Sequence, residues 1–373
     1  MRHVFLLATV LLCRVAIAQV SPYTGVAVVP PDSTGNYRLL IGGHFHGSST
    51  NSSGFPAATL LANIETLNAT GASVFLSTGD LFLRPDRDSV RFTTALFDKL
   101  ELPLFNAPGN HDLEGSAYHS ATRMPVMIPM GEDRILLLDT ERDNSDVNGD
   151  QLQQIKDAEQ AATEGLMEHL FIISHRPVWS EGEPKYGDLF SGNTRSLTGS
   201  NFTREVLPIL RRIAKYAEVF WISGSMAGRA PASIFFQQHE PNITFIQSAI
   251  RDELRDAVLI VDVRITPLSP AALRDGEGQG PASRRDRVRE KGVSWTGLSL
   301  TGQPLEPVQT YDAAWWKANQ GTPEPFHWRR IPYLIKTAVT NLNYWYGFGT
   351  AVLLLLLVGW SMRKGRILPV ERR

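Results

Sequence analysis

Four apolar stretches of the sequence are each followed by side chains that can bind a metal ion. In chain order these side chains are His44 and His46 in GGHFHG, Asp80 in STGDLF, Asn110, His111 and Asp112 in APGNHD, and His175 in SHRPVW. Imidazoles, carboxylates and amide oxygens are donors for divalent ions such as zinc, iron and manganese. Each residue taken alone also fits a structural role, such as a polar loop, a helix cap or a buried histidine. Four such stretches in succession favour one shared site.

The apolar stretches have the length and composition of buried strands. Strands are predicted at residues 37–43, 73–78, 102–106, 134–139, 169–174, 218–223 and 257–263. Helical spacing of apolar residues predicts helices at residues 56–67, 89–100, 148–162 and 201–215. The alternation predicts a layered α/β domain, with mixed sheets because strands become denser after residue 234. Since side chains at the carboxyl ends of neighbouring strands meet in one crevice of an open sheet, the candidate ligands should converge.

The motifs resemble those of the calcineurin-like metallophosphoesterases. That family carries D-x-H, G-D-x-x-[D/N], G-N-H-[D/E], a lone histidine after a strand, and G-H-x-H, and the likeness runs from about residue 38 to residue 263. The stretch SHRPVWS also resembles the small purple acid phosphatase branch. The resemblance implies an α/β fold in which a two-sheet sandwich is flanked by helices. It also implies phosphoester hydrolysis by divalent ions that hold the phosphate oxygens and a nucleophilic hydroxide.

By the same resemblance, the metal ligands of the family fall on five residues of this chain: His44, His46, Asp80, Asn110 and His175. His46 and Asp80 would belong to a first ion, and Asn110 and His175 would join Asp80 at a second. His111 would face the leaving oxygen as a general acid or an electrostatic clamp. Asp112 would act behind His111 as its supporting carboxylate.

The sequence departs from the family pattern at four positions of the site. The stretch GSMA stands where the family has G-H-x-H, so Ser225 and Ala227 replace two imidazoles. His44 replaces the aspartate of D-x-H, and Leu83 stands where some members have an iron-binding tyrosine or an acid. A purple iron centre is therefore not expected.

Charge limits the number of ions that the remaining ligands can hold. Asp80 is the only carboxylate left among the matched ligands, and two divalent ions with so little screening would repel each other. One ion is therefore expected rather than two, held by His44, His46 and Asp80. The triple change Ser225→His, Ala227→His and His44→Asp is expected to raise the metal content toward two ions per chain.

Two functions from different classes remain open. The first is a membrane-anchored, metal-dependent phosphoester hydrolase with a divergent and weakened metal site. The second is a catalytically inactive, phosphoesterase-like binding or scaffold protein whose crevice takes an unknown ligand. The retained GNHD motif favours the first, and the missing imidazoles favour the second. A substitute ligand from His239 or His119 would also favour the first.

Both ends of the chain carry predicted targeting segments. Residues 1–18 have a basic start, an apolar run and a small-residue end, which predicts a secretory signal peptide, and they contain the only cysteine, Cys13. Residues 337–362 carry no charged side chain, which predicts a transmembrane helix, and the basic tail at 363–373 would then lie in the cytoplasm. The phosphoesterase-like domain, residues 19–265, would lie outside the cytoplasm, in a periplasm or in an extracellular or lumenal space.

The remaining segment, residues 266–336, is predicted to be a linker that carries final strands and a juxtamembrane stretch. Its basic residues between 284 and 291 alternate with acidic ones, and the formal net charge of the whole chain is −1. Such a mixed stretch is typical of a solvated surface. No nucleic-acid partner is expected.

Overall fold

The structure is a computed structural model that describes residues 19–114, 124–187, 189–190, 199–226, 230–267, 289–320 and 342–365. The chain forms two compact units, Met1–Gly321 and Thr322–Arg373. The predicted signal peptide, the predicted juxtamembrane stretch and the end of the predicted tail lie outside the described residues.

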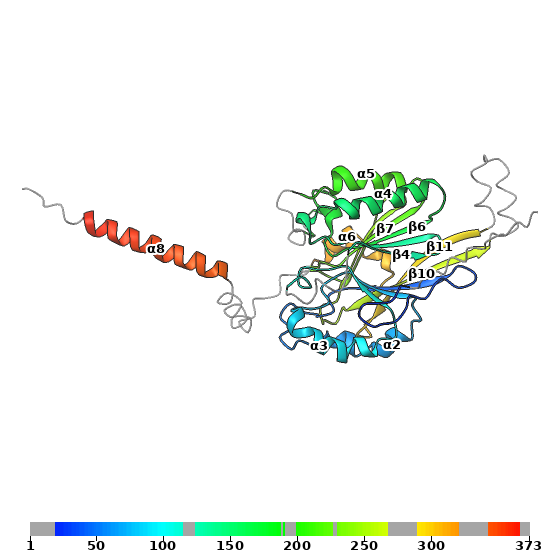
Figure 1. Cartoon of the computed structure of the whole chain (residues 1–373), viewed down its shortest axis with the longest axis horizontal. Helices are drawn as coiled ribbons and strands as arrows, with labels where there is room; N and C mark the ends of the chain where they lie inside the picture. The colour runs from blue at the N-terminus through cyan, green and yellow to red at the C-terminus, as the bar shows by residue number, and fades with distance from the viewer. Residues whose placement is uncertain are drawn as a thin grey trace, which may run out of the picture. The chain divides into compact units, whose positions relative to one another are not determined.

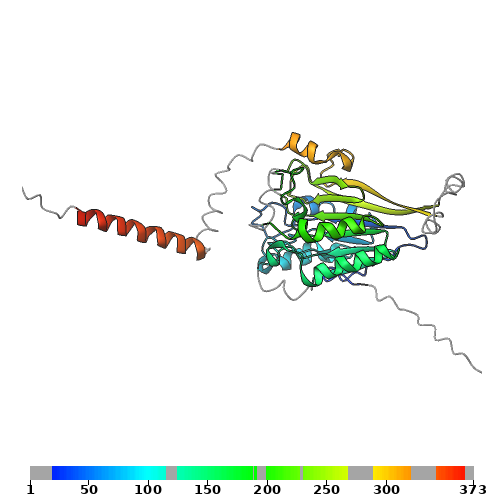
Figure 2. The same cartoon turned by 90° about the horizontal axis from the view of Figure 1, so that it is seen from above.

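The first unit contains a five-stranded mixed sheet in the order β11-β10-β1-β2-β3. Its strands are β1 Tyr37–Gly42, β2 Val74–Ser77, β3 Leu104–Asn106, β10 Ala257–Pro267 and β11 Arg289–Ser299. β1, β2 and β3 are parallel, and β10 and β11 continue the sheet in antiparallel pairing. Figure 2 shows β10 and β11 running side by side as a long ribbon pair. The carboxyl ends of the three parallel strands therefore share one edge of the sheet.

A second, six-stranded sheet has the order β4-β5-β6-β7-β9-β8. Its strands are β4 Val126–Met130, β5 Asp133–Leu137, β6 His169–Ile173, β7 Glu218–Ser223, β8 Ile234–Glu240 and β9 Ile243–Ser248. The four middle strands are parallel, and β4 and β8 are antiparallel edge strands. Every residue of β6, HLFII, is buried, as expected for a parallel strand covered on both faces.

Helices cover the outer face of each sheet. These helices are α1 Ala58–Leu61, α2 Ile64–Asn68, α3 Pro85–Ala95, α4 Gly149–Thr163 and α5 Leu207–Ile213. A further helix, α6 Ala313–Asn319, lies beside the edge strand β8. Short 3-10 turns lie at Phe97–Lys99, Asp143–Ser145, Val178–Ser180 and Val308–Thr310, and a π-helical turn at Phe202–Val206 leads into α5. Figure 1 shows α4 and α5 on one side of the strands, with α2 and α3 on the other. The unit is a two-sheet sandwich between two helical layers.

Alternating side chains of β1 and β2 reach two different cores. Leu39 and Ile41 join the large core that includes the six-stranded sheet, whereas Leu40 joins the smaller core beneath the helices that follow β1 and β2. In β2, Leu76 lies in the large core and Phe75 in the smaller one. Successive strand residues point to opposite faces, so each of these strands is held from both sides. This burial fixes the positions at which the loops after β1 and β2 begin.

The second unit contains the helix α8 Leu342–Gly365. The prediction of a transmembrane helix at residues 337–362 is wrong, because no helix among the described residues is both long enough and apolar enough to cross a membrane. Within α8, Gly347, Gly349 and Thr350 confine the uninterrupted aliphatic run to residues 351–358. The single-pass membrane localisation, which depended on that helix, is corrected with it.

Candidate metal centre

Asp80 lies at the centre of the predicted ligands, in the loop that follows β2. Its backbone φ of 56° is in the left-handed region, which residues other than glycine rarely adopt. One carboxylate oxygen, Oδ1, accepts a hydrogen bond of 3.1 Å from the backbone N–H of His111. A Cβ at Gly109 would lie 2.1 Å from the same oxygen, so only glycine lets the GNHD loop come this close. The two loops therefore aim the other oxygen, Oδ2, into the site.

Three imidazoles converge on Oδ2 of Asp80. The Nε2 atoms of His44 and His175 each lie 3.5 Å from Oδ2, and Nε2 of His46 lies 3.9 Å from it. His44 and His46 follow β1, His175 follows β6, and all three are buried. Two ligands of one tetrahedral ion, with bonds of about 2.0–2.1 Å, are roughly 3.3 Å apart. The pairs formed by His44 and His175 with Asp80 are therefore spaced as ligands of one ion.

The converging nitrogen atoms lack donors in the described part of the chain. Nε2 of His44, His46 and His175 is buried in each case and has no hydrogen-bond partner. Nδ1 of His175 lies 3.0 Å from the carbonyl oxygen of Thr78, which can only accept, so Nδ1 carries the proton and Nε2 presents a lone pair. The lone pair on Nε2 of His175 thus faces Oδ2 of Asp80, and the unpartnered Nε2 atoms of His44 and His46 lie beside them. A cation between them would satisfy all of them.

The ionisation states suit a metal ligand set. Burial lowers the pKa of His44 well below its usual value, and the opposite charge of Asp80 does not reverse this effect, so His44 is neutral at pH 7. Burial alone would raise the pKa of the Asp80 carboxyl, but the positive charge that His175 and the other imidazoles carry when they are protonated holds that pKa well below its usual range, so Asp80 ionises before the imidazoles lose their protons. Metals bind neutral imidazole and ionised carboxylate. The residues present therefore fit a divalent ion.

His111 lies at the more exposed side of this cluster. Its side chain is 25% exposed, and its ring meets that of His46 edge-on at 5.3 Å between centroids. Nδ1 of His111 lies 3.8 Å from Glu114, which is too long for a hydrogen bond. His46, Asp80 and His111 form a second group of ligand atoms that lie within 4.8 Å of one another, beside the group of His44, Asp80 and His175. Both groups share Asp80, as a bridging carboxylate would require.

Asp112 is buried behind the loops and holds them together. It accepts hydrogen bonds from the backbone N–H groups of Asp80 (2.9 Å), Phe82 (3.1 Å) and Gly109 (2.9 Å), and from the side-chain amide of Asn106 (2.9 Å). Burial and the nearby charge of Asp80 raise the pKa of Asp112 to about 6, although these donors oppose the shift. Its described contacts are with the two loops and not with the ring of His111.

Asn110 does not present its oxygen to the cluster. Its Oδ1 accepts a hydrogen bond of 2.8 Å from Nη2 of Arg176, the residue after His175. The same guanidinium pairs with the buried carboxylate of Glu141. Arg176 and Glu141 were not predicted as site residues. The R of SHRPVW was visible in the sequence, but its pairing with a carboxylate from another loop was not.

The stretch GSMA after β7 packs against the loop of His175. The backbone N–H groups of Gly224 and Ser225 donate to the carbonyl oxygen of His175 at 3.0 and 2.7 Å. A Cβ at Gly224 would lie 2.2 Å from the carbonyl oxygen of Thr78, so the stretch also lies close to the loop after β2. Ser225 therefore lies beside the site, as expected for a position that replaces an imidazole. Ala227 lies outside the described residues.

Neither proposed substitute histidine is seen in the site. His239 belongs to β8, where its Nδ1 lies 2.9 Å from the hydroxyl of Tyr186 and its ring stacks on Phe245 at 4.7 Å. His119 lies outside the described residues.

A second cluster of ionisable groups is already occupied by a lysine. Asp133, Glu168 and His169 offer ligand atoms close to one another, but Nζ of Lys291 lies 2.8 Å from Asp133 and 3.1 Å from Glu168. Burial alone would raise the pKa of Asp133, but His169 and Lys291 outweigh it and lower that pKa. The ammonium group supplies the positive charge here, so the cluster is an ion-pair network.

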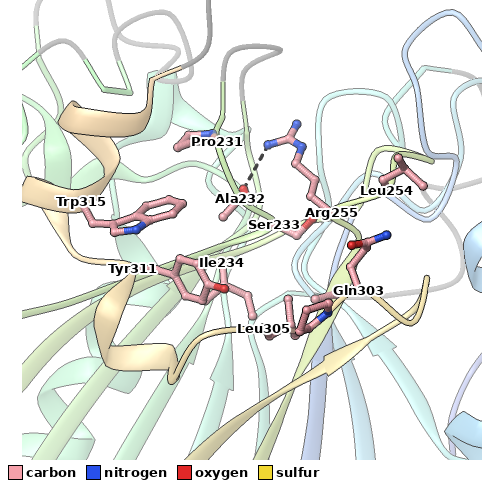
Figure 3. A pocket seen from close by; sticks show the side chains of 12 residues that line it. Pro231, Ala232, Ser233, Ile234, Leu254, Arg255, Gln303, Leu305, Tyr311 and Trp315 are labelled. Carbon is pink, nitrogen blue, oxygen red and sulfur yellow. Dashed lines mark hydrogen bonds between the residues drawn. The ribbon is translucent and has the colours of Figure 1, made fainter.

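A cavity of about 350 Å³ lies between β8, β10 and the segment that leads into α6. Its lining, drawn in Figure 3, is mainly apolar and includes Ile234, Leu254, Leu305, Tyr311 and Trp315. The guanidinium at its rim, from Arg255, donates to the carbonyl oxygens of Ala230 and Ala232. None of the predicted site residues lines this cavity.

Comparisons with known proteins give a distant structural likeness. No protein-family model matches the sequence, and no curated protein matches it. A dimetal phosphatase from Danio rerio is similar over 61% of this chain and 94% of its own, with 14% identity and a TM-score of 0.42. Vacuolar Protein Sorting 29 from Cryptosporidium parvum is similar over 71% of this chain and 98% of its own, with 11% identity and a TM-score of 0.31. Likeness at this level assigns no activity to this chain, and the narrower likeness to purple acid phosphatases stays a prediction.

Proposed function

We propose that this chain is a metal-dependent phosphoesterase whose divalent ion is bound through Asp80. The observation that carries the proposal is the convergence of three buried imidazole nitrogens on one carboxylate oxygen, with no donor among the described groups between them. The arrangement of two mixed sheets is consistent with the metallophosphoesterase fold that the motifs imply. His44, Asp80 and His175 would hold the ion, with His46 beside them.

Different residues of the chain would have different roles in such a reaction. When bound, a divalent ion stabilises the negative charge that builds on a phosphoryl group and makes water a stronger acid. His111, which is partly exposed at the side of the cluster, is placed to give a proton to a leaving oxygen. Asp112 fixes the relative positions of the loops that carry Asp80 and His111 through its four hydrogen bonds.

A catalytically inactive binding protein is the second candidate function. The contact of Asn110 with Arg176 favours it, because an expected metal ligand is engaged by a guanidinium. On this alternative the purified chain holds negligible metal, and Asp80→Asn leaves the binding of its ligand unchanged.

One experiment separates the two candidates. The purified chain is analysed for zinc, iron and manganese, and its turnover of an aryl phosphate monoester and an aryl phosphate diester is measured with each metal. Asp80→Asn should abolish both metal binding and turnover, whereas the matched exposed variant Asp98→Asn should change neither. Equal turnover in the natural chain and in Asp80→Asn would refute the enzymatic proposal.

A further inference from the structure

The guanidinium of Arg176 is fixed in place beside the candidate metal centre. Arg176 follows His175 directly, and its side chain is only 12% exposed. Its backbone N–H donates to the hydroxyl of Thr140 at 2.8 Å, and its guanidinium binds both carboxylate oxygens of Glu141. Such a bidentate ion pair with a carboxylate holds an arginine in one orientation. The positive charge therefore has a defined position.

Glu141 is the buried counter-ion that determines this position. Its side chain has no exposed area, and it comes from the loop after β5, the parallel neighbour of β6. An ion pair is costly to bury unless its geometry is good and its remaining hydrogen bonds are made. Here the other guanidinium N–H groups meet Oδ1 of Asn110 at 2.8 Å and Oγ of Ser225 at 3.4 Å. The buried ion pair of Arg176 and Glu141 is therefore hydrogen-bonded to residues of the candidate site.

Two uncharged partners of the Arg176 guanidinium stand at positions where the family resemblance implies metal ligands. The resemblance gave Asn110 as a ligand of a second ion, and Ser225 replaces one of the two imidazoles of G-H-x-H, of which each ion would lose one. Both oxygens now accept hydrogen bonds from one guanidinium. A divalent ion placed on the same oxygens would meet a fixed like charge in a buried site, where repulsion is strong.

We propose that Arg176 takes the place of a second metal ion, so that the centre combines one divalent ion with one fixed organic cation. This inference rests on the proposed function for its single ion and adds the charge partner of that ion. It also changes an expectation from the sequence: the triple change Ser225→His, Ala227→His and His44→Asp does not create a second metal site while Arg176 remains.

The test counts the Mn²⁺ ions bound by the full chain, measured by equilibrium dialysis. Electron paramagnetic resonance then shows whether two neighbouring Mn²⁺ ions are spin-coupled. The natural chain and Ser225→His should each bind one ion and show no coupling. The double variant Arg176→Gln with Ser225→His should bind two ions that are coupled, because Asn110, Glu141 and the new imidazole become available. The matched control Arg176→Lys with Ser225→His keeps the positive charge and should bind one.

Removal of Arg176 leaves Glu141 buried without this ion-pair partner, so folding is checked by circular dichroism and thermal melting. If the double variant does not fold, the triple variant Arg176→Gln, Glu141→Gln and Ser225→Asp removes the buried ion pair but keeps a second carboxylate ligand, and it is tested in its place, with two ions again expected. A natural chain that binds two ions, or arginine-free variants that stay at one, would overturn this inference alone. A complete lack of metal in every variant would overturn the proposed function together with it.

Discussion

Replacement of Asp80 by asparagine is expected to have opposite effects on the metal-free and the metal-bound protein. The substitution keeps the shape of the side chain, and the amide oxygen can still accept the hydrogen bond from the backbone N–H of His111. The new amide N–H₂ takes the place of Oδ2 and points at Nε2 of His44 and of His175, each 3.5 Å away. Donors thereby face acceptors that lack a partner among the described groups of the natural protein.

The magnitudes follow from the number of contacts. Two long hydrogen bonds between neutral groups contribute about 1 kcal/mol together, because each net contribution is about 0.5–1.5 kcal/mol and 3.5 Å is the outer limit of the geometry. At pH 8, above the usual imidazole pKa of about 6.5, Asp80 has no positively charged histidine partner, and the melting temperature of the metal-free variant should therefore rise by about 1–2 °C. Metal at a concentration of one hundred times its dissociation constant stabilises the natural protein by about 2.7 kcal/mol, and this gain should vanish in Asp80→Asn.

Thermal melting with a chelator and with added Mn²⁺ tests both signs at once. The expected result is a crossing, in which the variant melts higher without metal and the natural protein melts higher with it. Asp98→Asn should follow the natural protein under both conditions. If Asp80→Asn melted several degrees lower without metal, Asp80 would be a structural carboxylate and the reasoning from unpartnered imidazoles would be refuted.

Three further changes probe the positions around the site. Gly109→Ala should destabilise the chain by about 1–3 kcal/mol and weaken metal binding in calorimetric titration, because its Cβ would lie 2.1 Å from Oδ1 of Asp80. The control Gly292→Ala, whose Cβ enters open space, should leave metal binding unchanged. Equal metal binding in both variants would count against the close approach of the loops. Asp133→Asn should lower the free energy of unfolding in urea at pH 7, because a carboxyl whose pKa is lowered in the folded state stabilises the fold when it is ionised. The difference in unfolding free energy between the variant and the natural chain should shrink as the pH falls below about 4, the pKa of this carboxyl in the unfolded chain. A difference that stays constant down to pH 3 would contradict this account. His239→Ala should leave the metal content unchanged, and a loss of metal would show that this histidine reaches the site.

Strands that are buried on both faces were predicted from the sequence, and strands that depend on a partner were not. β6 and β7 are near-continuous apolar runs and were predicted close to their observed ends. β4, VMIPM, alternates between buried and exposed residues at the edge of its sheet and was missed. Final strands were expected within residues 266–336, but the partner of β11 was not: β11, which begins REKGVSW, pairs with β10 over eleven positions. The predicted helix at residues 56–67 is divided into α1 and α2.

The convergence of four candidate ligands was predicted from the motifs. His44, His46, Asp80 and His175 each follow a strand and meet in one cluster, because parallel pairing places the carboxyl ends of β1 and β2 together and the contact of His175 with Thr78 brings the end of β6, from the other sheet, to them. The pairing of Glu141 with Arg176 could not be predicted, since the two residues are 35 positions apart and only the adjacency of β5 and β6 brings them together. The error at α8 has a different cause: the absence of charge and the leucine run were taken as sufficient for a membrane span, although no helix among the described residues is long and apolar enough.

The charges around the cluster are consistent with the proposed single ion and with an anionic ligand. Asp80 contributes one negative charge, and Arg176 and Glu141 cancel each other as a buried pair. The charge of Asp112 is directed at four N–H donors behind the loops. One divalent ion on Asp80 would therefore leave the cluster with a net positive charge that suits a phosphate ester. A second divalent ion would add two further charges beside a guanidinium that cannot lose its proton, and no additional carboxylate among the described residues of the cluster would balance them.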